Sequence, residues 1–549
     1  MNHTMNKAKT EGTTKRLDSN KIIRIVLIAI LVLTIGLRLW GIDHGLPYIY
    51  DPDEPLTVVI AGGMLANRDF NPHWFGHPGT TNIYLLVFID LVIYLSGLLS
   101  GRFTGPQDFR AYYHADPSEI YLGGRLLNIL FAAATVIVIY FIAKQIVSRK
   151  WVWLPPLLFA ISPLHVGFSK YIRSDTLLTL FIVLVVYFSL EIQHKGSLRS
   201  YIFAGICTGL GVATKYPAAL AVPVVFAAHF FKENDHQQNS SNLMLYIGAC
   251  AAGVIIGSPY LLLDVQTVVT DLLQESRTEH LGADGLGFFG NLIFYFRTLV
   301  ESGVGWGALG FAMVGSLIAF VKKHKNVFLL ILFTIVFIGG VSILSLHWSR
   351  WVIPVIPIIC ILTACGFEKS VIWLNSKIAP SASIFIQICV LLAIVTPMLF
   401  LSIQQSKTLA GPDTRTLTRE WLLQNVEPEK KILMEIYTPI LPKDAFIFYS
   451  VNENGNLALY DPEDSYKTYF KSTGHIGDID NLNEVYGYGV DYFVIGSMYE
   501  RYQNAGEKFQ EKALVYLDMI NNSKLVFESV PVTGSVNGPP VRVYQVLKP

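Results

Sequence analysis

Charged residues are scarce in this chain of 549 residues. Asp, Glu, Lys and Arg together make up 15%, whereas 52% of the residues are hydrophobic. The mean hydropathy is +0.44. A soluble protein of this size needs a more polar surface, so the composition predicts an integral membrane protein. The net charge is only +1, which gives no electrostatic basis for binding nucleic acid or another polyanion.

Cysteine is rare as well. The five cysteines all lie inside apolar stretches and form no Cys-x-x-Cys pair. This pattern is typical of small hydrophobic core residues and not of a disulfide framework. No small-residue cleavage site follows the first apolar run, 22–40, which is long enough to cross a membrane. We therefore interpret this run as a signal anchor, with the basic segment before it in the cytoplasm.

Apolar runs of spanning length continue to about residue 401, and short basic turns such as 194–199 and 322–325 separate several of them. Because basic turns favour the cytoplasm, the pattern predicts about eleven spans, a cytoplasmic N-terminus and an extracytoplasmic C-terminus in a multi-pass plasma-membrane protein. The predicted spans are 22–40, 125–144, 151–168, 176–192, 201–214, 218–231, 243–262, 305–321, 327–346, 351–367 and 383–401.

The run 82–100 is apolar enough to span, but it carries Asp90 in its middle. If it spanned, the next span would leave Lys144, Arg149 and Lys150 outside, against the positive-inside rule. We expect this run to lie along the outer interface instead.

Charged and turn residues become frequent after about residue 404. Short β-type runs at 431–436, 445–451, 492–495, 525–530 and 541–546, with helical patterns at 414–424 and 508–520, predict a soluble extracytoplasmic α+β domain over 404–549. The predicted order is a cytoplasmic tail (1–21), a multi-span membrane domain (22–403) and this domain. It shows no catalytic constellation. It either binds or positions an acceptor for a reaction of the membrane domain, or it caps the external face. The cap is the favoured interpretation.

An acidic turn follows the first span. Asp51, Asp53 and Glu54 lie between Tyr50 and Pro55. Carboxylates at a membrane boundary are costly to desolvate, so they are normally excluded there unless they serve a site. The flanking prolines restrict the backbone of this turn. A solvated acidic loop is the alternative interpretation.

The predicted topology brings further polar groups to the same outer face, from several separate loops. They are His73, His77, Arg125, Tyr171, Arg173, Asp175, Lys215, Arg277, Glu279, His280, His347 and Arg350. Singly, the cations could snorkel from span ends, Asp175 could pair with Arg173, and His77 could be a satisfied interfacial histidine. Their convergence on one face indicates a site.

The chemistry that suits such a face is transfer from a phosphate-activated lipid. A carboxylate can deprotonate an incoming acceptor, and cations stabilise the charge on a departing phosphate. No cofactor is certain. Asp53 and Asp175 could share a divalent cation, although they lie on separate loops without metal-ligand spacing.

The order and spacing of six short motifs resemble the GT-C glycosyltransferases, in particular the protein O-mannosyltransferase and aminoarabinose transferase group. The resemblance covers roughly residues 20 to 400. The motifs are Pro52-Asp53-Glu54, Gly76-His77-Pro78, Arg125-Leu126, Arg173-Ser174-Asp175, Ala213-Thr214-Lys215-Tyr216 and Arg350-Trp351-Val352-Ile353-Pro354.

The resemblance implies a GT-C-like polytopic helical fold and a polyprenyl-phosphate sugar donor. It implies that Asp53 is the catalytic base with Glu54 beside it, that Asp175 belongs to a second acidic motif, and that Lys215 and Arg350 hold the lipid phosphate. His77 stands where aminoarabinose transferases tend to have Lys. The candidate catalytic residues are Asp53 and Glu54, and the candidate substrate-binding residues are His77, Arg125, Asp175, Lys215, His280 and Arg350.

We predict inverting transfer of a sugar from this lipid donor to a protein, lipid or cell-envelope glycan acceptor. A transporter or flippase is the alternative, but it would need polar groups near the middle of the membrane along a path through both leaflets, and no inverted repeat is present. A lipid-handling membrane protein without chemistry would not need the rigid acidic turn.

Overall fold

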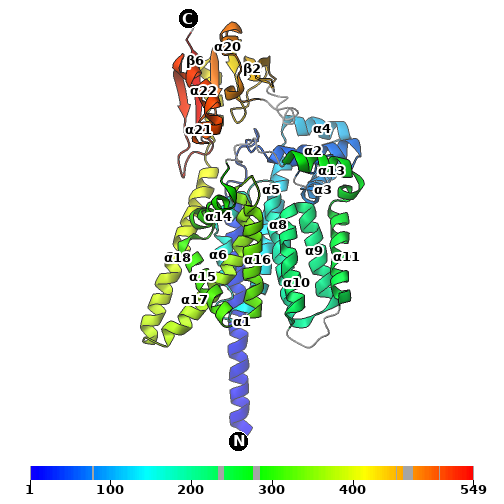
Figure 1. Ribbon diagram of the computed structural model, residues 1–549, viewed down its shortest axis with the longest axis vertical. Helices are drawn as coiled ribbons and strands as arrows, with labels where there is room; N and C mark the ends of the chain where they lie inside the picture. The colour runs from blue at the N-terminus through cyan, green and yellow to red at the C-terminus, as the bar shows by residue number, and fades with distance from the viewer. Residues whose placement is uncertain are drawn as a thin grey trace.

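The computed structural model describes residues 2–76, 79–232, 240–275, 285–452, 454–461, 474–505 and 507–547. It consists of a helical bundle and a C-terminal domain with a β-sheet, which lies over one end of the bundle (Figure 1). We call this end of the bundle the domain-side end. The N-terminus lies at the opposite end (Figure 1).

Eight helices of the described chain are long and apolar enough to cross a membrane. They are the Asn20–Leu39 part of α1 (Asn2–Leu39), α3 (Thr80–Leu99), α5 (Ser118–Ile146), α8 (Ser174–Lys195), α11 (Ser240–Gly257), α16 (Lys325–Ser342), η3 (Ser349–Val355) joined to α17 (Ile356–Asn375), and α18 (Pro380–Leu409). A ninth candidate is α14 (Gly287–Thr298) and η2 (Leu299–Gly303) followed by α15 (Gly305–Val321), which are bent by 118° at their junction. The prediction of a polytopic helical membrane protein is confirmed.

Three of the eleven predicted spans are not among these candidates. The run 151–168 forms α6 (Leu154–Ala160) and α7 (Pro163–Phe168), because Pro163 cannot continue the preceding helix. The runs 201–214 and 218–231 form α9 (Leu198–Thr214), η1 (Tyr216–Ala221) and α10 (Val222–Phe230), which are apolar but short.

Helix α3 crosses the domain-side ends of other helices. In its first turn, the Thr81 hydroxyl donates to the carbonyls of Leu210 in α9 and Gly257 in α11, at 3.4 Å each. Further along, residues 86–93 of α3 meet α5 at its first turns, around residues 123–124. In Figure 1, α3 lies with α2 (Glu54–Asn67), α4 (Pro106–Ala115) and α13 (Val265–Glu275) at this end. The short α12 (Tyr260–Leu263) precedes α13. This arrangement favours the interfacial interpretation of α3 over a spanning one.

Small residues let the bundle helices approach closely. A Cβ atom on Gly209 of α9 would collide with the backbone of α11 at Cys250, and one on Gly366 of α17 would collide with the backbone of α15 at Phe311. Such close backbone contact is a common way for helices to associate in a membrane, where burial of apolar surface between helices gives little.

The C-terminal domain contains a six-stranded sheet in the order β3-β2-β1-β4-β6-β5. Its strands are β1 (Lys431–Leu433), β2 (Ile447–Val451), β3 (Leu457–Leu459), β4 (Tyr492–Ile495), β5 (Ser523–Ser529) and β6 (Val541–Val546). β1 is parallel to both of its neighbours, β2 and β4, and the other pairings are antiparallel. The helices are α19 (Thr414–Asn425), α20 (Asn483–Gly487), α21 (Met498–Asn504) and α22 (Gln510–Asn521), with the 3-10 turns η6 (Ile476–Asp478) and η7 (Glu507–Phe509). Five strands and two helices were predicted, and the three-residue edge strand β3 was missed.

The position of α3 predicts which loops share one side of the membrane. In a variant without its native cysteines, we expect cysteines at Thr104, after α3, and at Asn454, in the C-terminal domain, to react with an impermeant maleimide added from outside. A cysteine at Lys322, between α15 and α16, should be protected until the membrane is opened. Protection at Thr104 together with labelling at Asn454 would show that α3 spans.

Candidate active site at the acidic turn

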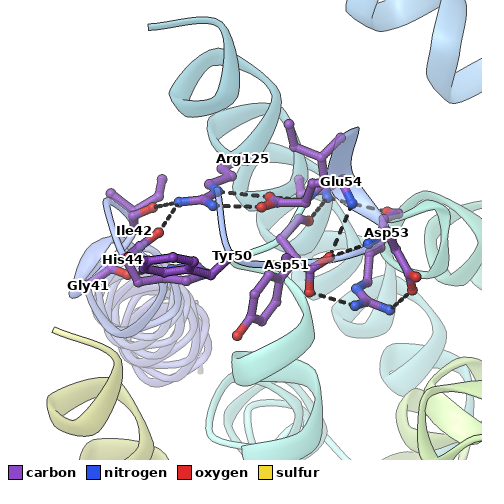
Figure 2. A network of polar contacts seen from close by, with 12 residues as sticks. Gly41, Ile42, His44, Tyr50, Asp51, Asp53, Glu54 and Arg125 are labelled. Atoms are coloured by element: carbon purple, nitrogen blue, oxygen red, sulfur yellow. Dashed lines mark hydrogen bonds and ion pairs between the residues drawn. The ribbon is translucent and has the colours of Figure 1, made fainter. Parts of the chain in front are cut away.

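The acidic turn is fixed by its own backbone. Oδ1 of Asp51 accepts hydrogen bonds from the backbone N–H groups of Asp53 (3.0 Å) and Glu54 (3.1 Å), as Figure 2 shows. These donors belong to the start of α2, where N–H groups have no partner inside the helix. Pro55 occupies the first turn of α2, where its fixed φ suits a helix start. The rigid turn expected from the prolines is therefore held mainly by Asp51.

Glu54 lies behind the turn in a buried ion pair with Arg125. Nε and one terminal nitrogen of Arg125 donate to the two carboxylate oxygens, at 2.8 and 2.6 Å, and the side-chain exposures are 1% for Arg125 and 0% for Glu54. The other terminal nitrogen donates to the carbonyls of Ile42 (2.7 Å) and His44 (2.9 Å) (Figure 2). The backbone N–H of Ile172 adds a third hydrogen bond to Glu54, at 2.8 Å.

This pair corrects two expectations about roles. Glu54 was predicted beside the catalytic base and Arg125 as a substrate-binding residue. Each is buried and already satisfied by the other, which is the arrangement that a charge needs in order to be stable in a low-dielectric interior. The structure gives both a supporting place: they anchor the turn to α5 and to the loop before α8.

Arg173 joins the two remaining carboxylates of the turn. Its guanidinium donates to Oδ2 of Asp51 at 2.7 Å and to Oδ2 of Asp53. Burial alone would lower the pKa of Arg173, but Asp51 and Asp53 more than offset it, so the pKa lies above its usual value and the side chain stays charged. The rings of Phe168 and Tyr171 lie 5.5 Å from the guanidinium and support it. Arg173 therefore pairs with the acidic turn and not with Asp175.

Asp175, at the start of α8, pairs with two other cations. Nζ of Lys215 lies 2.7 Å from its Oδ1, and Nε of Arg350 lies 3.9 Å from its Oδ2. A terminal nitrogen of Arg350 is also 3.4 Å from Oδ2 of Asp53. Asp175 and Lys215 are almost fully buried, whereas Arg350 is 17% exposed and Asp53 39%. The two exposed members of the cluster are thus Asp53 and Arg350.

These exposed groups form one side of a cavity of about 800 Å³ between the bundle and the C-terminal domain. The bundle contributes Asp51, Asp53, Arg173 and Arg350. The C-terminal domain contributes Tyr437, His475, Ser497, Arg501 and Lys512. A second cavity of about 460 Å³ shares Trp348, Ser497 and Arg501 with the first and also contacts His347 and Phe294. The volumes are of the size that small-molecule sites have.

The structure therefore brings Asp53, Asp175, Lys215 and Arg350 together from four separate segments, as predicted. His77 and His280 lie outside the described residues, as do Arg277 and Glu279. His73 lies apart from the cluster, hydrogen-bonded to Asp69 at 2.8 Å. The role of Arg173 and the contribution of the C-terminal domain were missed. Arg173 is extended and precedes α8, whereas Asp175 lies in the first turn of that helix, and the two side chains reach different partners.

The cluster does not fit the divalent cation that Asp53 and Asp175 could have shared. Both carboxylates already face cations: Arg173 and Arg350 for Asp53, and Lys215 and Arg350 for Asp175. Within the described ranges, no three His, Cys, Asp or Glu side chains are grouped so that they could hold a metal ion. No step below is derived through a metal.

The buried pair predicts a stability effect. Glu54→Gln would leave the Arg125 charge without its counter-ion, which should cost about 3–5 kcal/mol of folding free energy. Thermal unfolding of the purified protein in detergent measures this. Glu119→Gln, which breaks the exposed pair of Glu119 with Arg102, is the matched control and should change the melting temperature little. Equal melting temperatures for wild type and Glu54→Gln would contradict an anchoring role.

Comparison with known proteins finds a family that resembles part of the chain and solved structures that share its fold. A family model described as dolichyl-phosphate-mannose-protein mannosyltransferase matches residues 121–262, the segment that holds Arg125, Arg173, Asp175 and Lys215. No curated protein sequence gives a significant match.

Solved structures share the fold at low sequence identity. The structure of ArnT from Cupriavidus metallidurans bound to undecaprenyl phosphate is 13% identical, with a TM-score of 0.50, and the match covers 95% of this chain and 98% of that one. The oligosaccharyltransferase AglB from Archaeoglobus fulgidus, in complex with an inhibitory peptide and a dolichol-phosphate, is 12% identical, with a TM-score of 0.51 over 92% of this chain and 73% of that one. The chain thus shares the fold of these two membrane proteins, and residues 121–262 are similar to the mannosyltransferase family.

Proposed function

We propose that the protein transfers a sugar from a polyprenyl-phosphate donor to an acceptor at the outer face of the membrane, with Asp53 as the base. The observation that carries this proposal is the exposure of Asp53 and Arg350, side by side, on the cavity. The deeper charges of the cluster are paired and support these two.

The reaction is a single displacement. Asp53 takes the proton of the acceptor hydroxyl or amine as that atom forms a bond to the anomeric carbon of the sugar. The bond between the anomeric carbon and the phosphate oxygen breaks, and its electron pair leaves with polyprenyl phosphate. Attack from the side opposite the leaving group inverts the configuration at that carbon.

Arg350 is well placed to receive the phosphate. Its two ion pairs, with Asp53 and Asp175, are long, and no hydrogen bond to another described residue holds its guanidinium. The ring of Trp348, 5.2 Å away, supports it from one side. A guanidinium can donate to phosphate with two N–H groups and so stabilise the charge that develops on the leaving oxygen. Lys215 acts through Asp175 and does not line either cavity described above.

Two further points support the lipid donor and the outer face. The ArnT and AglB structures named above contain undecaprenyl phosphate and dolichol-phosphate. The basic turns 194–199 and 322–325 lie at the ends of α8 and α15, opposite the cluster, and basic turns favour the cytoplasm. The cluster and the C-terminal domain then face outward. Protein, lipid and cell-envelope glycan remain the proposed classes of acceptor.

Transfer can be tested with a radiolabelled polyprenyl-phosphate hexose and membranes of a deletion strain, which supply the acceptor. We expect label in a product that depends on both the purified enzyme and the lipid donor. Uptake of label into sealed vesicles without such a product would favour a transporter instead.

Asp53→Asn should lower turnover about 100-fold or more, because it keeps the size of the side chain but removes the base. Its melting temperature should stay close to that of wild type, since Asp53 is partly exposed. Asp108→Asn, on the surface helix α4, makes the same chemical change away from the cavity and should keep full turnover. Near-normal turnover of purified Asp53→Asn would remove Asp53 from the mechanism.

Arg350→Ala should raise the donor KM about tenfold or more, because a charge-assisted hydrogen bond to phosphate is lost. Arg350→Lys should recover only part of the affinity, since an ammonium cannot replace two parallel donors. Arg102→Ala, in an exposed pair far from the cavity, is the control. An unchanged donor KM in Arg350→Ala would refute the phosphate contact and leave the role of Asp53 standing.

A further inference from the structure

In the sheet of the C-terminal domain, the order in which strands are added reverses at β1, next to the cavity. The chain runs from β1 to its neighbour β2 and on to β3, and then returns to pair β4 with the other side of β1. β1 is parallel to both β2 and β4. In sheets with this arrangement, ligands bind in the crevice outside the carboxyl ends of the two strands where the order reverses, here β1 and β4.

This crevice opens onto the cavity above Asp53. Tyr437 follows the carboxyl end of β1, and Ser497 and Met498 follow that of β4. All three line the cavity. The end of the sheet that is suited to bind a ligand is thus the end that faces the base.

A buried carboxylate holds the crevice loops together. Glu435, two residues after β1, accepts hydrogen bonds from the backbone N–H of Gly496 after β4 (2.8 Å), from the hydroxyl of Tyr516 (2.6 Å) and from the N–H of Ile476 (3.4 Å). Burial raises the pKa of Glu435 to about 7. Burying such a group is costly, and here it fixes the loops after both strands in one geometry.

Tyr437 is held in a strained backbone conformation. Its φ is +66°, in the left-handed region that a bulky side chain rarely adopts. Strain of this kind persists where the surroundings fix it, and it is common in ligand sites. Burial raises the pKa of the Tyr437 phenol, Arg501 opposes the rise, and Asp53 and Asp51 add to it. The Tyr437 side chain lines the same cavity as Asp51, Asp53 and Arg501.

Arg501 carries the uncompensated positive charge on this side of the cavity. The neighbouring cations are paired, Arg415 with Asp413 and Lys512 with Asp478. Among the residues that the structure describes, Arg501 has no carboxylate partner; its guanidinium contacts the sulfur of Met498 at 3.7 Å. It lines both cavities. An incompletely paired guanidinium in a cleft suits an anionic ligand group.

We propose that this crevice binds the acceptor and that the acceptor carries an anionic group, a carboxylate or a phosphate, which Arg501 holds. This proposal rests on the proposed function, since it places the acceptor hydroxyl or amine between the crevice and Asp53. The C-terminal domain then selects the acceptor, while Arg350 in the bundle holds the donor.

The test measures acceptor and donor separately. With saturating lipid donor, the amount of deletion-strain membranes that gives half-maximal transfer should rise about tenfold or more in Arg501→Gln, because a charge-assisted contact is lost. The donor KM should not change. Arg501→Lys should recover part of the effect. Lys524→Gln, on the exposed face of the edge strand β5, removes a charge from the same domain and should behave as wild type.

Inorganic phosphate and acetate serve as probes of the anionic group. The better inhibitor in competition with membranes indicates whether phosphate or carboxylate is held, and its effect should weaken in Arg501→Gln. Phosphate should also raise the melting temperature of wild type more than that of Arg501→Gln, which tests the site without any turnover.

Three results would overturn the proposal: an unchanged acceptor requirement in Arg501→Gln, a raised donor KM in its place, or equal effects of both anions on wild type and variant. Wild-type enzyme that gives no donor-dependent product would instead count against the proposed function. The melting temperatures would then still decide whether Arg501 binds an anion.

Discussion

The buried pair of Glu54 and Arg125 determines where the cluster lies. Arg125 ties α5 to the loop after α1 through two carbonyls, and Glu54 ties α2 to the backbone of Ile172. The residue after Ile172 is Arg173, which reaches Asp53. Asp53, the proposed base, and Arg173 are thus positioned by one ion pair that a substrate does not need to touch. A buried pair gives little net stability, but it fixes one arrangement of the segments that it joins.

Charge is arranged in layers around this pair. The innermost charges, Glu54 and Arg125, neutralise each other away from water, and Asp175 with Lys215 does the same beside them. At the cavity the ion pairs of Arg350 are long, whereas Asp53 is held by Arg173 and is still partly exposed. In a low-dielectric site an unpaired charge is costly, so an incoming phosphate would gain more at Arg350 than at Arg125, Arg173 or Lys215, whose ion pairs are shorter. The same paired charges keep Asp53 and Arg350 in position.

The sequence supports the class of fold and the members of the cluster, but not their pairing. Long apolar runs and basic turns place Asp53, Asp175, Lys215 and Arg350 on one face, because membrane thickness constrains span length and charge constrains orientation. The pairing depends on the direction in which each side chain leaves the backbone, which the sequence alone does not give. Asp53 and Glu54 are adjacent in sequence, yet α2 begins between them and sends one side chain to the cavity and the other into the core.

The sequence does not predict the contribution of the C-terminal domain to the cavity, for a related reason. Its strands could be predicted from local patterns, whereas its contribution to the cavity depends on docking between segments more than 300 residues apart, such as Tyr50 and Thr416. Once the C-terminal domain is docked, the bundle and the domain differ in how much their cavity residues can change. The bundle residues that hold charge are locked to one another, so they tolerate little change. The loops after β1 and β4 sit on a separate sheet, where side chains facing the cavity can differ without disturbing the ion pairs below. A fold built in this way can keep one donor chemistry and change its acceptor.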